Sequence, residues 1–124
     1  MKALSLKQPW ADLVLSGRKI IELRKWNTNF RGEFYIHASR IPDKEAMKKF
    51  GFKDLPCGFI LGKANLMDVK IYDNEKEFLR DSDRHLASNM KFGKYGFIIN
   101  NVKKIEPTEH KGKLGFFEIS INKH

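Results

Sequence analysis

The chain has 124 residues, a length that suits one domain around a single hydrophobic core, so we expect one domain over residues 1–124. Apolar residues make up 41% of it and phenylalanine occurs 10 times, which excludes a disordered chain. The 24 Lys and Arg against 15 Asp and Glu give a net charge of +9, which favours nucleic acid and, second, an anionic membrane as partner. A lysine-rich surface that serves only solubility is the alternative.

Targeting and metal-binding signals are absent from the sequence. The N-terminal segment lacks the apolar run of a signal peptide, and no stretch approaches the length of a transmembrane helix. Cys57 is the only cysteine, so no internal disulfide can form, and we expect it to be a small packed side chain. The histidines are scattered without zinc-ligand spacing. We therefore expect a soluble, cytoplasmic protein with no membrane association, no metal and no cofactor.

Short strands and short helices alternate along the first half of the chain. Residues 3–6 predict a strand, and Pro9 suits the first turn of a helix that presents Trp10, Leu13 and Val14 on one face. Gly17 is the expected stop of that helix. Further strands are predicted over 20–26 and 32–38, with a second helix over 42–50.

The second half predicts two longer strands and a short helix. Residues 58–71 are long for one strand, and Gly62 near the middle predicts a bulge or a barrel corner. Asn74 followed by Glu77 matches a capping box, so a helix is expected over 75–79. The polar, aperiodic residues 82–92 predict a loop. The last strands are predicted over 95–100, which 101–105 can prolong, and over 116–121.

Strands mixed with short helices, without a βαβ alternation, predict an α+β fold. We expect a small, mainly antiparallel β-barrel of about five or six strands, closed or nearly closed, with about two or three short flanking helices. The helix over 9–16 should pack against the rim of this barrel. The sequence contains no repeat, linker or low-complexity tract.

A row of polar and aromatic side chains marks the second predicted strand. Alternation along 20–26 places Ile21 and Leu23 on one face and Glu22, Arg24 and Trp26 on the other. A carboxylate, a guanidinium and an indole in one row indicate the wall of a polar cleft with a stacking surface. An internal ion pair covered by a tryptophan is the alternative.

Each residue of the row has a role that fits its chemistry. The planar fork of Arg24 can hold a phosphate in two bonds, and Glu22 can orient that fork or accept from the exocyclic amine of a base. A base stacked on an exposed indole gains about 1–3 kcal/mol. Trp10 and Trp26 are both candidate stacking contacts. We favour Trp26 for this role, because the position of Trp10 on an amphipathic helix favours the core.

Basic residues elsewhere predict a positively charged rim. Arg31 lies in a turn where it can clamp a phosphate, and His37 on the third strand is a candidate neighbour of the cleft, although a lone strand histidine usually has a structural hydrogen bond. Lys111 and Lys113 flank a glycine in a loop that can follow a nucleic-acid backbone. A solvated charged face is the alternative for this loop.

These segments resemble the signature of the ASCH domain family. The resemblance rests on Gln8-Pro9-Trp10, on the pattern G-x-K-x-x-E-x-R from Gly17 to Arg24, and on closing strands over 94–117. It implies a PUA-like β-barrel and a role in RNA binding. It also implies that Lys7, Gln8 and Lys19 belong to the cleft, although strict alternation from residue 20 places Lys19 on the opposite face.

Three functions are compatible with the sequence, and we favour the first. It is a module that binds RNA or another single-stranded nucleic acid, because the resemblance points there and no helix-turn-helix pattern serves duplex DNA. The second is an enzyme, and the third is a protein-interaction module. A nuclease or NTPase is disfavoured, since the sequence has no Gly-rich phosphate loop and no cluster of metal-binding carboxylates.

The second function is an enzyme. Some bacterial members of the family resembled are amidohydrolases that act on N4-acetylcytidine through a Lys, a Thr and a Glu. Lys19 matches the Lys, but Glu22 stands at the position of the Thr, and Glu75 or Glu77 are the only guesses for the Glu. Glu22, tuned by Lys19, is then the candidate general base on water. We therefore expect weak or absent hydrolysis.

Overall fold

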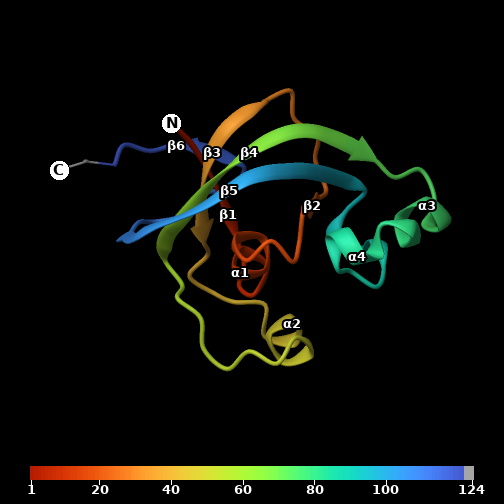
Figure 1. Ribbon diagram of the computed structural model, residues 1–124, viewed down its shortest axis with the longest axis horizontal. Helices are drawn as coiled ribbons and strands as arrows, with labels where there is room; N and C mark the ends of the chain where they lie inside the picture. Colours follow the sequence, from red (N-terminus) through yellow and green to blue (C-terminus); the bar gives the residue numbers. More distant parts are fainter. Residues whose placement is uncertain (122–124) are drawn as a thin grey trace.

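The computed structural model describes residues 1–121, which form one sheet with short helices around it (Figure 1). The strands are β1 (Lys2–Leu6), β2 (Ile21–Arg24), β3 (Gly32–Ala38), β4 (Phe59–Ile71), β5 (Tyr95–Glu109) and β6 (Phe116–Glu118). The helices are α1 (Trp10–Leu15), α2 (Lys44–Lys49), α3 (Glu75–Arg80), α4 (Ser82–His85) and the 3₁₀ turn Met90–Phe92.

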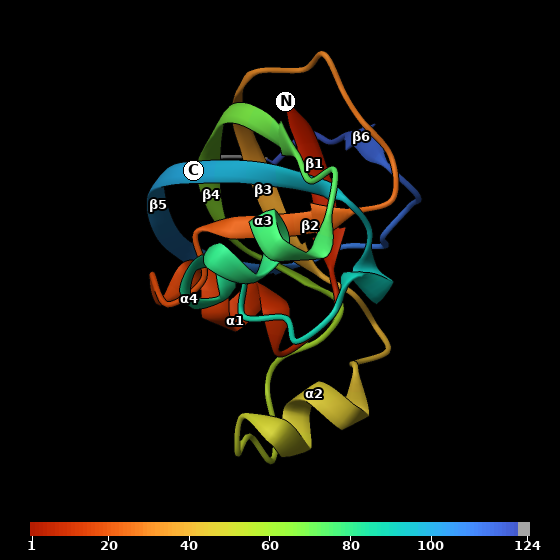
Figure 2. The same cartoon turned by 90° about the vertical axis from the view of Figure 1, so that its right-hand side faces the viewer.

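The six strands lie in the order β2-β5-β4-β3-β1-β6, and only the pair β1 and β3 is parallel. The long strands β4 and β5 curve together over α1, and β2 runs along the edge of β5 that faces α1 and α4 (Figure 2). The α+β fold with a mainly antiparallel sheet and short helices is therefore confirmed. The sheet is strongly curved but open, because its hydrogen-bonded ladder ends at β2 and β6 instead of joining them.

Side chains bridge the two ends of the open sheet. Arg24 at the end of β2 donates from Nη2 to the backbone carbonyl of Ser5 in β1. Trp26, just after β2, lies edge-on to Phe97 of β5 at 5.2 Å and to Phe116 of β6 at 5.9 Å between ring centroids. The Arg24 and Trp26 side chains thus connect the two ends of the sheet, which in a closed barrel are joined by strand pairing.

Helix α1 packs on the sheet at Gly62 in β4, where the sequence predicts a bulge or a barrel corner. The register of β4 against β5 shifts between Ile60 and Gly62. A Cβ atom at Gly62 would collide with the side chain of Leu15 in α1 and with the carbonyl of Lys103 in β5. The glycine therefore permits close contact of three elements, and the predicted bulge is confirmed.

The segment predicted as a loop over residues 82–92 is partly helical, so that prediction was wrong. It contains α4 and the 3₁₀ turn, and His85 in α4 is fully buried. Elements of three or four residues are too short to show a hydrophobic period, which explains the error. The neighbouring prediction is confirmed, since the side chain of Asn74 accepts from the N–H of Glu77 and begins α3.

The main core lies between α1 and the concave side of the sheet and includes Leu6, Val14, Phe34, Ile36, Leu66 and Phe97. A second cluster around Tyr72 and Phe78 joins α3 and the segment after α4 to β2. A third, around Trp10 and Ala46, joins α1 to α2. Within residues 1–121, no helix combines the length and the apolar character that crossing a membrane requires.

Candidate functional site

Lys19, Glu22 and Arg24 form a chain of charges that begins just before β2 and runs to its last residue. Lys19 Nζ lies 3.4 Å from Glu22 Oε1, and Arg24 Nε lies 3.5 Å from Glu22 Oε2. The side chains of Lys19 and Glu22 are only 3% and 7% exposed, whereas that of Arg24 is 22% exposed. Lys19 also donates to the carbonyl oxygen of His85 at 2.9 Å.

Lys19 shares the side of Glu22 because it precedes the strand. Its N–H donates to the carbonyl of Leu13, which ties it to the end of α1, and β2 begins only at Ile21. Alternation from residue 20 therefore does not apply, and Ile20 is the side chain that faces solvent. The ammonium of Lys19 lies 4.4 Å from the centre of the Trp10 ring, a cation–π distance.

Burial has the largest effect on the pKa of Lys19. It lowers the pKa of Lys19 below the usual range, and the charge and hydrogen bond of Glu22 oppose that effect, while the charge of Arg24 adds to it. Within residues 1–121, Arg24 Nε is buried without a hydrogen-bond partner, although Glu22 Oε2 lies 3.5 Å away. The Glu22 carboxylate is thus held between two cations out of water.

The predicted row does not form an open wall. Strand β2 ends at Arg24 instead of Trp26, and Glu22 is buried. Trp26 is partly buried and packs against the core beside Phe97 and Phe116, so it supports the fold, and its role as a stacking contact stays a prediction. The reason is that the curved sheet brings β6 over the residues that follow β2.

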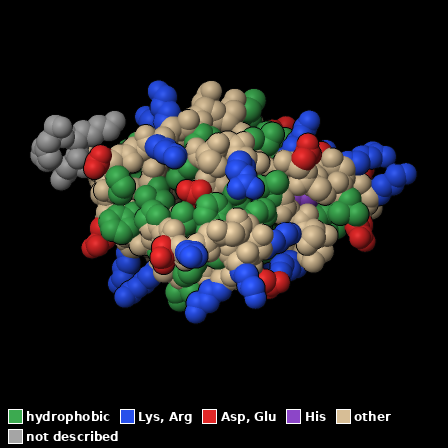
Figure 3. All heavy atoms as spheres, turned by 60° about the horizontal axis from the view of Figure 1, so that its bottom comes forward, with side chains coloured by type: hydrophobic (Ala, Val, Ile, Leu, Met, Phe, Trp, Pro, Cys, Tyr) green, Lys and Arg blue, Asp and Glu red, His purple; other side chains and the backbone are tan. Residues whose placement is uncertain are grey.

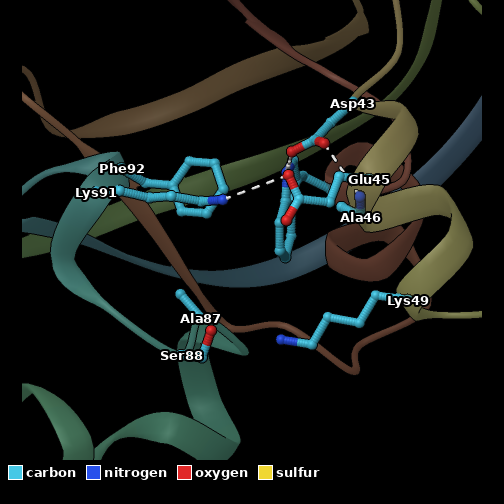
Figure 4. Close-up of a pocket in the computed structure, with 9 residues that line it drawn as sticks. Asp43, Glu45, Ala46, Lys49, Ala87, Ser88, Lys91 and Phe92 are labelled. Atoms are coloured by element: carbon cyan, nitrogen blue, oxygen red, sulfur yellow. Dashed lines mark hydrogen bonds and ion pairs between the residues drawn. The ribbon is translucent and has the colours of Figure 1, made fainter.

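Trp10, the predicted core residue, borders a small surface hollow of about 60 Å³, which we call the Trp10 hollow (Figure 4). The indole is 7% exposed and donates from Nε1 to Asp43 Oδ2 at 3.1 Å. Phe50 and Phe92 hold it edge-on, at 5.5 and 5.3 Å between centroids. The lining residues are Trp10, Asp43, Glu45, Ala46, Lys49, Ala87, Ser88, Lys91 and Phe92.

Two lysines and two carboxylates border the Trp10 hollow. Lys49 extends from α2 toward the segment that holds Ala87 and Ser88, on the side opposite Lys91 (Figure 4). Lys91 Nζ lies 3.9 Å from Glu45 Oε2, a long ion pair between exposed groups. The edge of a planar ring placed here would contact aromatic carbon and a carboxylate acceptor, and one lysine would lie on either side of it.

A second and larger hollow, which we call the His37 hollow, lies where β3 ends and β4 begins. Its volume is about 560 Å³, and its lining residues are His37, Arg40, Cys57, Gly58, Glu109, His110, Lys111 and Gly112. His37 Nε2–H donates to the carbonyl of His110 at 2.7 Å, so Nδ1 accepts from the Ser5 hydroxyl at 2.8 Å. Burial lowers the pKa of His37, against the hydrogen bond to His110, so the ring is neutral.

The remaining predicted residues lie apart from both hollows. Gln8 is fully buried and structural, since its side chain donates to the Pro56 carbonyl and accepts from the N–H of Asp12. Arg31 is exposed in its turn, where it pairs with Asp68 and local carbonyls. Lys7 and Lys113 are exposed. Lys113 is the residue after Gly112, which lines the His37 hollow, but it does not line the hollow itself.

Sequence reasoning missed most residues that line the hollows. Asp43, Lys49, Lys91 and Phe92 border Trp10 but come from two other segments, α2 with its cap and the 3₁₀ turn, and Arg40 likewise borders His37 from a different segment. Asp43 carried one signal, because a residue of its type begins a helix, and it does accept from Ala46 N–H. Its second bond, from the Trp10 indole, has no local signature.

The chain is similar in sequence to one protein family and to curated proteins of human and mouse. The ASCH domain family model matches residues 4–109. Activating signal cointegrator 1 from Homo sapiens is 29% identical over 103 residues, which cover 72% of this chain and 18% of that protein. The Mus musculus protein of the same name is 28% identical over the same shares. The chain thus spans about a fifth of the length of these relatives.

Solved structures share the fold. The crystal structure of ASCH from Zymomonas mobilis has a TM-score of 0.69 at 15% identity, over 96% of this chain and 87% of that one. A mutant form of the Zymomonas mobilis protein gives a TM-score of 0.71 at 15% identity, over 96% and 89% of the two chains. At this identity the likeness shows the fold and no more.

Proposed function

The chain belongs to the ASCH domain family, and we propose that it binds single-stranded RNA, with one base in the Trp10 hollow and phosphates beside the lysines that border it. The observation that carries this proposal is the composition of the hollow. An indole backed by the Lys19 ammonium forms one side, and Lys49 and Lys91 stand at opposite borders. Aromatic and cationic groups together are typical of single-strand binding surfaces.

The size and shape of the Trp10 hollow favour an unpaired base. About 60 Å³ admits the edge of a ring but not a whole nucleotide. The Glu45 carboxylate can accept from an exocyclic amine, as carboxylates do with cytosine N4. Reaching that edge requires a base that is not paired, which single-stranded RNA provides. The helices of the described chain have at most six residues, which is short for reading a major groove.

The surrounding charge supports the same partner. The net charge is +9, and lysine and arginine side chains border the face shown in Figure 3, with hydrophobic side chains exposed between them. Such a surface attracts a phosphate backbone and releases its counterions on binding. Of the residues predicted from the sequence, the proposal retains Trp10 as a contact and Lys19 as the cation behind it.

The test uses Trp10 fluorescence. The chain has two tryptophans, so Trp26→Phe leaves Trp10 as the single reporter and keeps an aromatic ring against Phe97 and Phe116. In this background, single-stranded RNA should quench the emission, and the affinity should fall about tenfold between roughly 50 and 200 mM salt. The double change Lys49→Glu and Lys91→Glu should weaken binding by a further factor of about ten.

The matched control is Lys48→Glu with Lys94→Glu. These exposed lysines adjoin the same elements but do not line the hollow, and the control variant has the same net charge. It should retain most of the affinity. Equal weakening by both double variants, or binding without quenching, would contradict the proposal.

An amidohydrolase is the competing proposal, and two observations weigh against it. Lys19 and Glu22 are nearly inaccessible, and each is engaged by another protein group. A general base needs a position from which it can reach water and substrate. We therefore expect no acetate release from N4-acetylcytidine. If the unmodified protein released acetate, and the rate of release followed the fraction of protein that is folded, the enzyme would be the better proposal.

A further inference from the structure

We propose that the His37 hollow is a second site, which binds a phosphate group of a nucleotide. Its volume of about 560 Å³ falls within the range of small-molecule pockets, whereas the Trp10 hollow is much smaller. The proposal does not depend on RNA binding at Trp10.

The charged groups at the border of this hollow suit an anion. Arg40 and Lys111 are exposed, and within residues 1–121 neither forms an ion pair. The planar fork of Arg40 can bind two phosphate oxygens, and Lys111 adds a mobile point charge. Glu109 also lines the hollow and opposes an anion, so the two cations exceed it by one charge.

The floor of the hollow is neutral and built of backbone. The hydrogen bonds of His37 fix its neutral form, with Nε2–H directed to His110. A Cβ atom at Gly112 would lie 2.7 Å from Ser5 Oγ and 2.8 Å from His37 Cε1, so the bare backbone of Gly112 packs directly on the ring. Gly58 also lines the hollow, and the space where its Cβ would lie is empty, so its main chain is open to close approach by a ligand.

Hydrogen bonds hold the walls in place before any ligand arrives. The N–H of Gly58 donates to the carbonyl of Ala38 at 2.8 Å, and the N–H of His110 donates to the carbonyl of Gly58 at 3.0 Å. His37 then joins β3 to the segment after β5 through His110. Nδ1 of His110 donates to the Lys111 carbonyl at 2.7 Å and fixes the ring beside the hollow. A preformed site loses less entropy on binding.

The test titrates the protein with cytidine 5′-monophosphate and with cytidine, and follows amide signals by NMR. The monophosphate should bind about tenfold more tightly, with the largest shifts at Gly58 and Gly112. Arg40→Gln with Lys111→Gln should remove that advantage, and Glu109→Gln should increase it. Lys113→Gln is the matched control, because it removes a charge from the same loop without touching the hollow, and it should leave the affinity within about twofold.

Two further arms separate the sources of phosphate and the two sites. Cytidylyl-cytidine without a terminal phosphate should bind as tightly as the monophosphate if internal phosphodiesters are the ligand, and more weakly if the terminal group is. Lys49→Glu with Lys91→Glu should leave these affinities unchanged. Equal binding of nucleoside and nucleotide, or shifts confined to the Trp10 hollow, would overturn the proposal, whatever the outcome of the RNA experiment.

Discussion

Lys19 links the fold and the candidate site more closely than any other single residue. Its ammonium contacts the Glu22 carboxylate, the His85 carbonyl and the ring of Trp10, which come from β2, α4 and α1. A buried carboxylate with two cationic neighbours is tolerated only while those neighbours stay in place. The charge chain therefore holds Trp10 at the border of its hollow.

We expect Lys19→Met to lower the free energy of unfolding by about 3–5 kcal/mol, because it leaves the Glu22 carboxylate buried with only a long contact to Arg24. The measurement is urea unfolding followed by circular dichroism. Adding Glu22→Gln should recover part of the loss, since the stranded charge is then gone. A loss below about 1 kcal/mol would mean that Glu22 is stabilised mainly by Arg24.

At the scale of elements, the contact of α1 with the sheet positions both Trp10 and Lys19. Helix α1 begins at Trp10 and its last residue, Leu15, lies against Gly62. The bulge in β4 at this point makes room for the helix. A glycine is needed because a side chain would have to occupy space that Leu15 and the Lys103 carbonyl already fill.

Gly62→Ala should therefore destabilise the protein by about 1–3 kcal/mol, through overpacking between α1 and β5. Thermal melting measures this. The double variant with Leu15→Ala should lose less than the sum of the two single losses, because shortening Leu15 removes one of the two clashes. Strict additivity of the two changes would show that α1 does not press on Gly62.

At the scale of the whole molecule, two buried histidines connect distant elements. His37 joins β3 to Ser5 and His110, and His85 donates from Nε2 to the Phe78 carbonyl while Nδ1 accepts from the N–H of Ala87. Burial lowers the pKa of both rings, and the hydrogen bonds to carbonyl oxygens only partly oppose it. The folded protein thus keeps both histidines neutral.

Stability should consequently fall as the pH drops below the ordinary histidine pKa of 6.5. The unfolded chain takes up protons there and the folded chain resists them, so acid favours unfolding until the pH passes the lowered pKa values. Melting temperatures at pH 7.5, 6.5 and 5.5 should show the decline. The double variant His37→Gln and His85→Gln should have a flatter profile, and an equal slope in both proteins would contradict the assignment.

The amino-acid sequence determined the local elements and the membership of this chain in its family. Hydrophobic period, the Asn74 cap and the bulge at Gly62 depend on neighbours along the chain, so they could be predicted. The pattern from Gly17 to Arg24, together with the upstream Gln8-Pro9-Trp10, identified the ASCH domain, which the match over residues 4–109 bears out. That residues 1–124 form one domain stays a prediction.

The tertiary structure alone decided which of these residues are accessible. Spacing assigns Glu22 and Trp26 to a face of their own strand, but it cannot say what packs on that face, and the curved sheet brings Phe116 over Trp26. It likewise cannot show that α2 and the segment after α4 meet around Trp10, or that Arg40 and Lys111 share a hollow. Both hollows are made by segments far apart in the chain, and only long-range packing brings such segments together.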